Sequence, residues 1–75
     1  MIRMCDLKPG QKGRILFLET DSPLRERLFI MGLTPGCVVE MVGKAPFGSP
    51  LIFRLRGYSL TLRKKDLEKI GVALL

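Results

Sequence analysis

The chain has 75 residues, with 13 Lys and Arg, 7 Asp and Glu and no His, which gives a formal net charge of +6. This length allows one domain around one small core, and a hydrophobic content of 47% is enough to build that core. Without His the chain lacks the usual general base near neutral pH, and it has little room for a cleft, so these features argue against a stand-alone enzyme.

The first predicted element is a short strand that follows a tight turn. Pro9-Gly10 fits a type II turn, in which Pro fixes φ and Gly adopts a positive φ. A strand is then expected at residues 14–19. Its apolar run at residues 15–18 does not alternate, so either both faces of the strand are covered or one face is a contact surface.

One good helix is predicted, at residues 22–31. Ser22 is the expected N-cap, Pro23 suits the first helical position, and Gly32 suits the position just after the helix end. Residues 25–27 are expected to lie away from the apolar face. That face is a stripe at i, i+4 and i+7, formed by Leu24, Leu28 and Met31.

The second half of the chain predicts short strands separated by Pro and Gly. The expected strands are residues 37–42, 51–56, 59–63 and 70–72, with a loop at 44–50 and a helical turn at 64–68. The strand at 51–56 alternates cleanly, with Leu51, Phe53 and Leu55 on one face and Arg54 and Arg56 on the other. Five strands and one inserted α-helix predict a mainly β fold, a small SH3-like barrel in a single domain spanning residues 1–75.

Four groups of residues then occur in an informative order and spacing. They are Leu7 with Pro9-Gly10 and residues 13–15; residues 24–28 with 31–36; Ala45-Pro46 with residues 48–51; and residues 56–58 with Leu60, Leu62 and Arg63. In this arrangement the chain resembles the FeoA family, the small cytoplasmic partner proteins of bacterial and archaeal ferrous-iron transport. The resemblance runs from about residue 7 to residue 72, and residues 28–36 are its most specific part.

The resemblance implies an SH3-like barrel with an inserted helix and a non-enzymatic role. It also implies docking on, or regulation of, the membrane ferrous-iron permease that carries a cytoplasmic GTP-binding domain, at the inner face of the membrane. Ferrous iron is then the cargo of the permease. Iron-dependent repressors carry the same module, but no helix-turn-helix segment lies beside it here, so a repressor is not expected.

Metal ligands are scarce in the sequence. Cys5 and Cys37 lie far apart and there is no His, so the chain alone cannot fill a structural zinc site. We therefore expect no bound metal or cofactor, while a weak site shared between chains, at Cys5 or at Asp21 and Glu26, stays open. No signal peptide or long apolar segment is visible, so a cytoplasmic protein with two reduced thiols is expected.

Candidate partner-binding residues fall in three regions: the helix-to-strand connection, a loop tip and two basic strands. They are Met31, Leu33 and Pro35; Pro46 and Phe47; and Arg54, Arg56 and Arg63 with the adjacent Lys64 and Lys65. The connection either only reverses the chain or also rims a binding groove. The aromatic at the loop tip either folds back onto the barrel or anchors a partner. The basic residues form either a solvated face or a surface for an acidic protein, phosphates or anionic lipid.

The competing class is a small barrel that binds RNA or DNA. Residues 10–15 are similar to a short motif of ribosomal and transcription-factor barrels, and the net charge of +6 favours this class. Against it, basic and acidic residues are interleaved, and no stacking pair of exposed aromatics is evident. We therefore expect a protein partner and no nucleic acid. Apolar residues at 15–18 and 28–31 leave a weak homodimer open.

Overall fold

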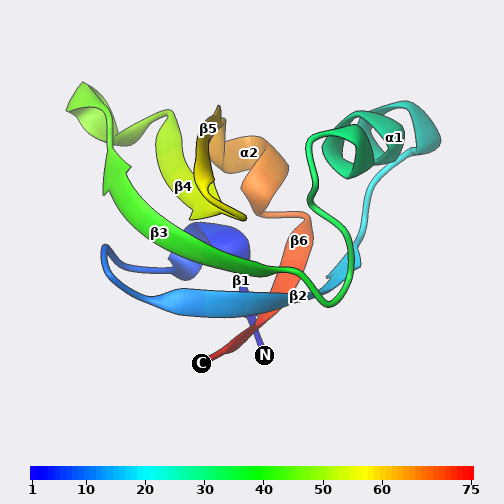
Figure 1. Ribbon diagram of the computed structural model, residues 1–75. Helices are drawn as coiled ribbons and strands as arrows, with labels where there is room; N and C mark the ends of the chain where they lie inside the picture. The colour runs from blue at the N-terminus through cyan, green and yellow to red at the C-terminus, as the bar shows by residue number, and fades with distance from the viewer.

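The computed structural model describes residues 1–47 and 49–75 in full, and of Gly48 only the backbone. Short elements follow one another closely along the chain (Figure 1). They are β1 (Ile2–Arg3), η1 (Met4–Asp6), β2 (Lys12–Leu18), α1 (Ser22–Ile30), β3 (Val38–Lys44), η2 (Pro46–Gly48), β4 (Leu51–Leu55), β5 (Tyr58–Leu62), α2 (Lys64–Leu67) and β6 (Ile70–Leu74).

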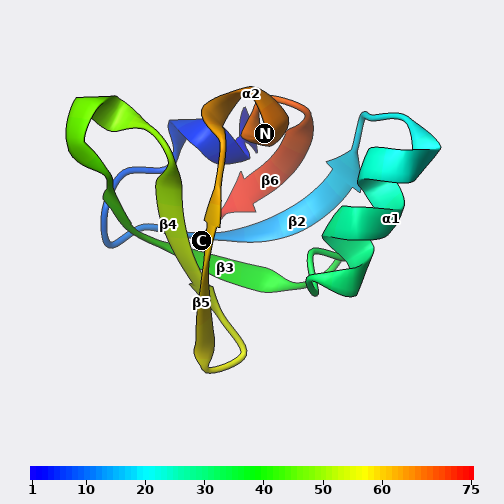
Figure 2. The same cartoon turned by 90° about the horizontal axis from the view of Figure 1, so that it is seen from above.

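The strands form one antiparallel sheet that curls around the core. Its order is β1-β6-β2-β3-β4-β5. Figures 1 and 2 show α2 between β5 and β6 and α1 standing at the side of the barrel. The predicted mainly β fold with one inserted helix is confirmed, but the described chain has six strands where five were predicted. The missed strand is β1, whose two residues pair with β6 and are too few to show alternation.

A β-bulge explains the apolar run in β2. The pairing with β6 shifts register between Ile15 and Phe17, so Leu16 is the extra residue. Ile15 and Leu18 therefore both face the core, although they are three residues apart. Leu16 is left 42% exposed. The Arg3 guanidinium lies over the ring of Phe17, with Arg3 Cζ 5.3 Å from the ring centroid. The outer face of β2 is thus only partly covered.

The core is built from hydrophobic side chains alone, because none of the side chains described as buried is polar or charged. Leu51, Phe53 and Leu55 all point inward, as their alternation predicts. Two fully buried residues from outside the sheet, Met4 of η1 and Leu67 of α2, contribute to this core. The N-terminal segment, which shows no clear pattern in the sequence, is therefore part of the packed domain.

The N-cap of α1 lies one residue earlier than predicted. Asp21, rather than Ser22, is the N-cap, and its Oδ1 accepts a hydrogen bond of 3.1 Å from the Leu24 N–H. Gly32 follows the helix at φ +98°, as its predicted position requires. At nine residues α1 is short, and no helix in the described chain is long and apolar enough to cross a membrane.

Candidate partner-binding groove

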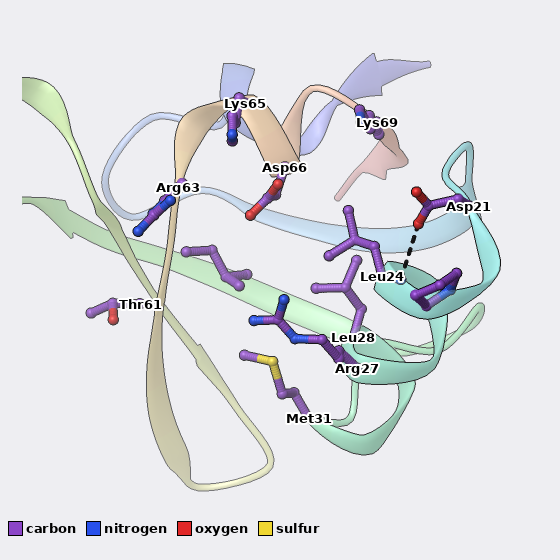
Figure 3. Close-up of a pocket in the computed structure, with 12 residues that line it drawn as sticks. Asp21, Leu24, Arg27, Leu28, Met31, Thr61, Arg63, Lys65, Asp66 and Lys69 are labelled. Carbon is purple, nitrogen blue, oxygen red and sulfur yellow. Dashed lines mark hydrogen bonds between the residues drawn. The ribbon is translucent and has the colours of Figure 1, made fainter.

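A groove of about 690 Å³ opens between α1 and the part of the barrel formed by β5 and α2 (Figure 3). Leu28 is the single buried residue of α1 among those described, so the helix contacts the core through little of its surface. The expectation that so short a chain has little room for a cleft is therefore wrong. The reason is that α1 stands away from the barrel instead of packing fully against it.

An apolar wall runs along the helix side of the groove. Leu24, Leu28 and Met31 share one face of α1 because they are spaced at i, i+4 and i+7, which confirms the predicted stripe. Leu24 and Met31 are only half-buried, so part of this wall is open to a ligand. Leu62 of β5 adds apolar surface to the lining.

Charged side chains form the rim of the groove, and positive charge predominates. They are Arg27 of α1, Arg63, Lys65 and Lys69 around α2, and the acidic Asp21 and Asp66. The prediction that residues 25–27 lie away from the apolar face is wrong for Arg27, because it is four residues before Met31 and shares its side of the helix. Among the described side chains, both ion pairs lie outside the groove, so its four cations have no carboxylate within 4.0 Å.

A contact joins the start of β5 to the end of α1. The Tyr58 hydroxyl donates a hydrogen bond to the Met31 carbonyl. Gly32 permits this approach, because a Cβ at this position would lie 2.5 Å from the Tyr58 hydroxyl and 3.3 Å from Leu55 Cδ1. Gly32 is therefore required both for its positive φ and for the space it leaves.

The predicted helix-to-strand residues divide between the groove and the core. Met31 lines the groove. Leu33 is fully buried, so its prediction as a partner contact is wrong: its side chain fills the core beneath the connection. Pro35 is exposed in a turn closed by a 3.0 Å hydrogen bond from the Cys37 N–H to the Thr34 carbonyl. A role for Pro35 in binding stays a prediction.

The predicted basic residues do not form one surface. Arg63 borders the groove, whereas Arg56 lies in the β4–β5 turn at φ +48°, at the other end of β5. The two residues are 7 positions apart in the sequence, which corresponds to roughly 20 Å of extended strand. Arg54 points outward from β4 and lies 3.6 Å from Glu40 Oε1, in an ion pair that includes none of the other predicted residues. Lys64 and Lys65 border a second hollow with Arg63, Ser49 and Pro50.

The loop tip is exposed. Phe47 has a relative exposure of 106% and a left-handed backbone at φ 72° and ψ 12°. The interpretation that its ring folds back onto the barrel is therefore wrong. A bulky residue in this backbone region is unfavourable and uncommon, and Pro46 beside it is also exposed. Both stay candidates for a partner contact, outside the groove.

The cysteines offer little to a metal ion. Cys37 is buried and Cys5 is half-buried. Burial raises the pKa of the Cys5 thiol, and the carboxylates of Asp6 and Glu68 raise it further, which disfavours the thiolate that binds metals. Across the residues that the structure describes, no three His, Cys, Asp or Glu side chains lie close enough together to hold an ion.

The sequence alone did not single out several groove residues. Arg27 and Lys69 occur among ordinary exposed charges, and Thr61 is a typical strand residue. Arg27 could have been found from its spacing, because it is three residues after Leu24 and four before Met31 and therefore lies on their side of the helix. Nothing local marks Thr61 and Lys69, because they reach the groove through the tertiary placement of β5 and α2.

Comparisons with known proteins agree on one family. A family model for the FeoA domain matches residues 2–74. The chain is 31% identical over 74 residues to the "Fe(2+) transport protein A/Fe(2+) transporter FeoB fusion protein" of Porphyromonas gingivalis. The alignment covers 99% of this chain and 9% of that relative, so the chain spans less than a tenth of the relative's length.

Solved structures show the same fold. The solution structure of iron(II) transport protein A from Clostridium thermocellum superimposes with a TM-score of 0.94 at 35% identity, covering 99% of this chain and 46% of that one. A FeoA-like protein from Clostridium acetobutylicum gives a TM-score of 0.89 at 35% identity, and the match covers 99% of this chain and 86% of that one. FeoA from Stenotrophomonas maltophilia, described as an SH3 domain protein, has a TM-score of 0.83 at 21% identity, and the match covers 97% of this chain and 91% of that one. The predicted SH3-like barrel is thereby confirmed.

Proposed function

Because this chain belongs to the FeoA family, whose members are associated with ferrous-iron transport, we propose that it is a non-catalytic accessory protein that binds the cytoplasmic part of the membrane ferrous-iron permease. The groove between α1 and β5 is the observation that carries the proposal. In the Porphyromonas gingivalis relative a similar domain is joined to the transporter FeoB in one chain, which supports a working contact between the two.

The composition of the groove suits a protein partner. Interfaces combine an apolar centre with a polar rim, and here the wall of α1 supplies the apolar part. The four rim cations favour a partner with acidic side chains, since complementary charge speeds and orients docking. A net charge of +6 also suits a protein that works beside the anionic inner face of a membrane. Ferrous iron remains the cargo of the permease.

The proposal is tested by measuring binding to the permease held in lipid nanodiscs. We expect Met31→Glu to weaken binding at least about tenfold, because it places a charge in the apolar wall. Val42→Glu is the matched control, since Val42 is also a partly exposed apolar residue but lies on β3, outside the groove lining. Absence of binding by the unmodified protein would overturn the proposal.

The same preparation tests the two remaining interpretations. A nucleic-acid complex would lose affinity steeply with added salt, so titration with single-stranded RNA at low and high salt measures that alternative. A weak homodimer would use the exposed apolar residues Leu16, Phe29 and Ile30. Sedimentation equilibrium over a range of protein concentrations measures it, with Ile30→Glu as the variant expected to abolish self-association.

A further inference from the structure

The strand β5 has an unpaired edge. In the described sheet its strand neighbour is β4, and no strand lies on its other side. The turn between them has two residues, Arg56 and Gly57, at φ +48° and +84°, as in a type I′ hairpin. In such a hairpin the closing pair is hydrogen-bonded, and bonded and non-bonded pairs then alternate. The N–H and C=O groups of Ser59 and Thr61 therefore point away from β4.

This free edge borders the groove. Thr61 and Leu62 line it, and α1 forms the facing wall (Figure 3). None of the described backbone hydrogen bonds outside the regular elements involves Ser59 or Thr61. Sheet edges are usually protected by Pro, Lys, bulges or very short strands. β5 has none of these, because its sequence is Tyr-Ser-Leu-Thr-Leu and it pairs with β4 without a register shift.

The positive charge of the groove rim favours an acidic segment as the added strand. A strand added beside β5 would lie between the apolar wall of α1 and the cations Arg63 and Lys65 at the end of β5, with Arg27 on the facing helix. Its side chains alternate between two faces, so an alternation of apolar and acidic residues matches the surroundings. A second copy of this chain is a poor occupant, because each copy carries a net charge of +6.

We propose that an extended acidic segment of the partner protein adds as a further strand to the free edge of β5, inside the groove. Its backbone pairs with Ser59 and Thr61, its apolar side chains contact Leu24 and Met31, and its carboxylates meet the cationic rim. This inference rests on the proposed function, which it deepens by stating the conformation and chemistry of the bound segment.

Amide hydrogen exchange, followed residue by residue by NMR, tests the pairing. Two probes are used: a synthetic peptide that alternates Glu with Val or Ile, and the permease in nanodiscs. We expect the Ser59 and Thr61 amides to exchange rapidly in the free protein and at least about tenfold more slowly with either probe at saturation. The amides of Leu60 and Leu62 already bond to β4 and serve as internal references.

A matched pair of substitutions removes one edge donor. Thr61→Pro deletes the outward N–H, a position where an edge strand tolerates Pro, whereas Thr61→Val retains it. We expect Thr61→Pro to weaken peptide binding about threefold to tenfold, because this is the usual effect of losing one hydrogen bond. Thr61→Val should leave the affinity for the peptide near its original value. Retained amide shifts in the core, for example at Phe53, verify that both variants are folded.

The two probes separate the failure of this inference from that of the proposed function. If the permease binds but protection lies elsewhere, or Thr61→Pro binds like Thr61→Val, strand addition is refuted and the proposed function stands. If the permease does not bind although the peptide protects Ser59 and Thr61, the proposed function fails and the edge remains an acidic-strand site. Protection of neither amide by either probe overturns the inference outright.

Discussion

The contact between Gly32 and Tyr58 gives the sharpest prediction. We expect Gly32→Ala to destabilise the domain more than Gly36→Ala. Both glycines have a positive φ, +98° and +93°, so each substitution carries a similar backbone penalty. They differ in their surroundings: a Cβ at Gly36 meets nothing within 4 Å, whereas one at Gly32 would lie 2.5 Å from the Tyr58 hydroxyl.

The magnitude follows from these two contributions. Left-handed backbone costs an alanine about 1–2 kcal/mol, which is the full expected loss for Gly36→Ala. Gly32→Ala additionally displaces the Tyr58 hydroxyl from the Met31 carbonyl, at about 0.5–1.5 kcal/mol for the lost hydrogen bond. The expected difference of about 1 kcal/mol corresponds to a Tm about 4–8 °C lower for Gly32→Ala in a domain of this size.

Urea unfolding and thermal melting of both variants, alone and with Tyr58→Phe, measure the difference. Once the hydroxyl is removed, the next nearest atom to the added Cβ is Leu55 Cδ1 at 3.3 Å, a tight contact that a small shift relieves. In the Tyr58→Phe background we therefore expect Gly32→Ala and Gly36→Ala to lose nearly the same free energy of unfolding. Equal losses in the unmodified background, or a persistent gap after Tyr58→Phe, would refute the reasoning.

Three further outcomes are expected from unfolding measurements. Leu33→Ala should cost about 2–5 kcal/mol because the side chain is fully buried, whereas Ile30→Ala, 86% exposed, should stay within about 0.5 kcal/mol; equal losses would contradict the placement of Leu33. Asp21→Ala should cost about 1 kcal/mol through loss of the N-cap, and Ser22→Ala much less; the reverse order would restore Ser22 as the cap. Phe47→Gly should leave stability unchanged or raise it by about 1 kcal/mol, since it removes a left-handed aromatic with a fully exposed ring; a clear loss would show that the ring packs.

Much of the fold follows from local patterns in the sequence. The alternation of Leu51, Phe53 and Leu55 fixes which face of β4 is inward, and the spacing of Leu24, Leu28 and Met31 fixes one face of α1. Two features escaped prediction because their causes are not local. β1 exists only through pairing with β6 at the other end of the chain, and the bulge at Leu16 depends on the register of that same strand.

The site was harder to predict than the fold. Three of the ten candidate residues line the groove: Met31 at the end of α1, and Arg63 and Lys65 at the start of α2. The apolar stripe was visible, but a stripe does not say whether the core covers it. That depends on how far α1 stands from the barrel, which the sequence does not encode at any single position.

The distance of α1 from the barrel is explained by the few contacts that hold the helix in place. Leu28 inserts into the core from the middle of the helix, and the Tyr58 hydroxyl holds the last turn through the Met31 carbonyl. Between these anchors and the N-cap at Asp21, the helix has no other fully buried side chain in the described structure, so its inward face keeps an open apolar surface. A helix held by one buried side chain, two half-buried ones (Leu24 and Met31) and one hydrogen bond leaves room beside β5 without unfolding the barrel. The features that stabilise α1 weakly are therefore the same features that form the groove.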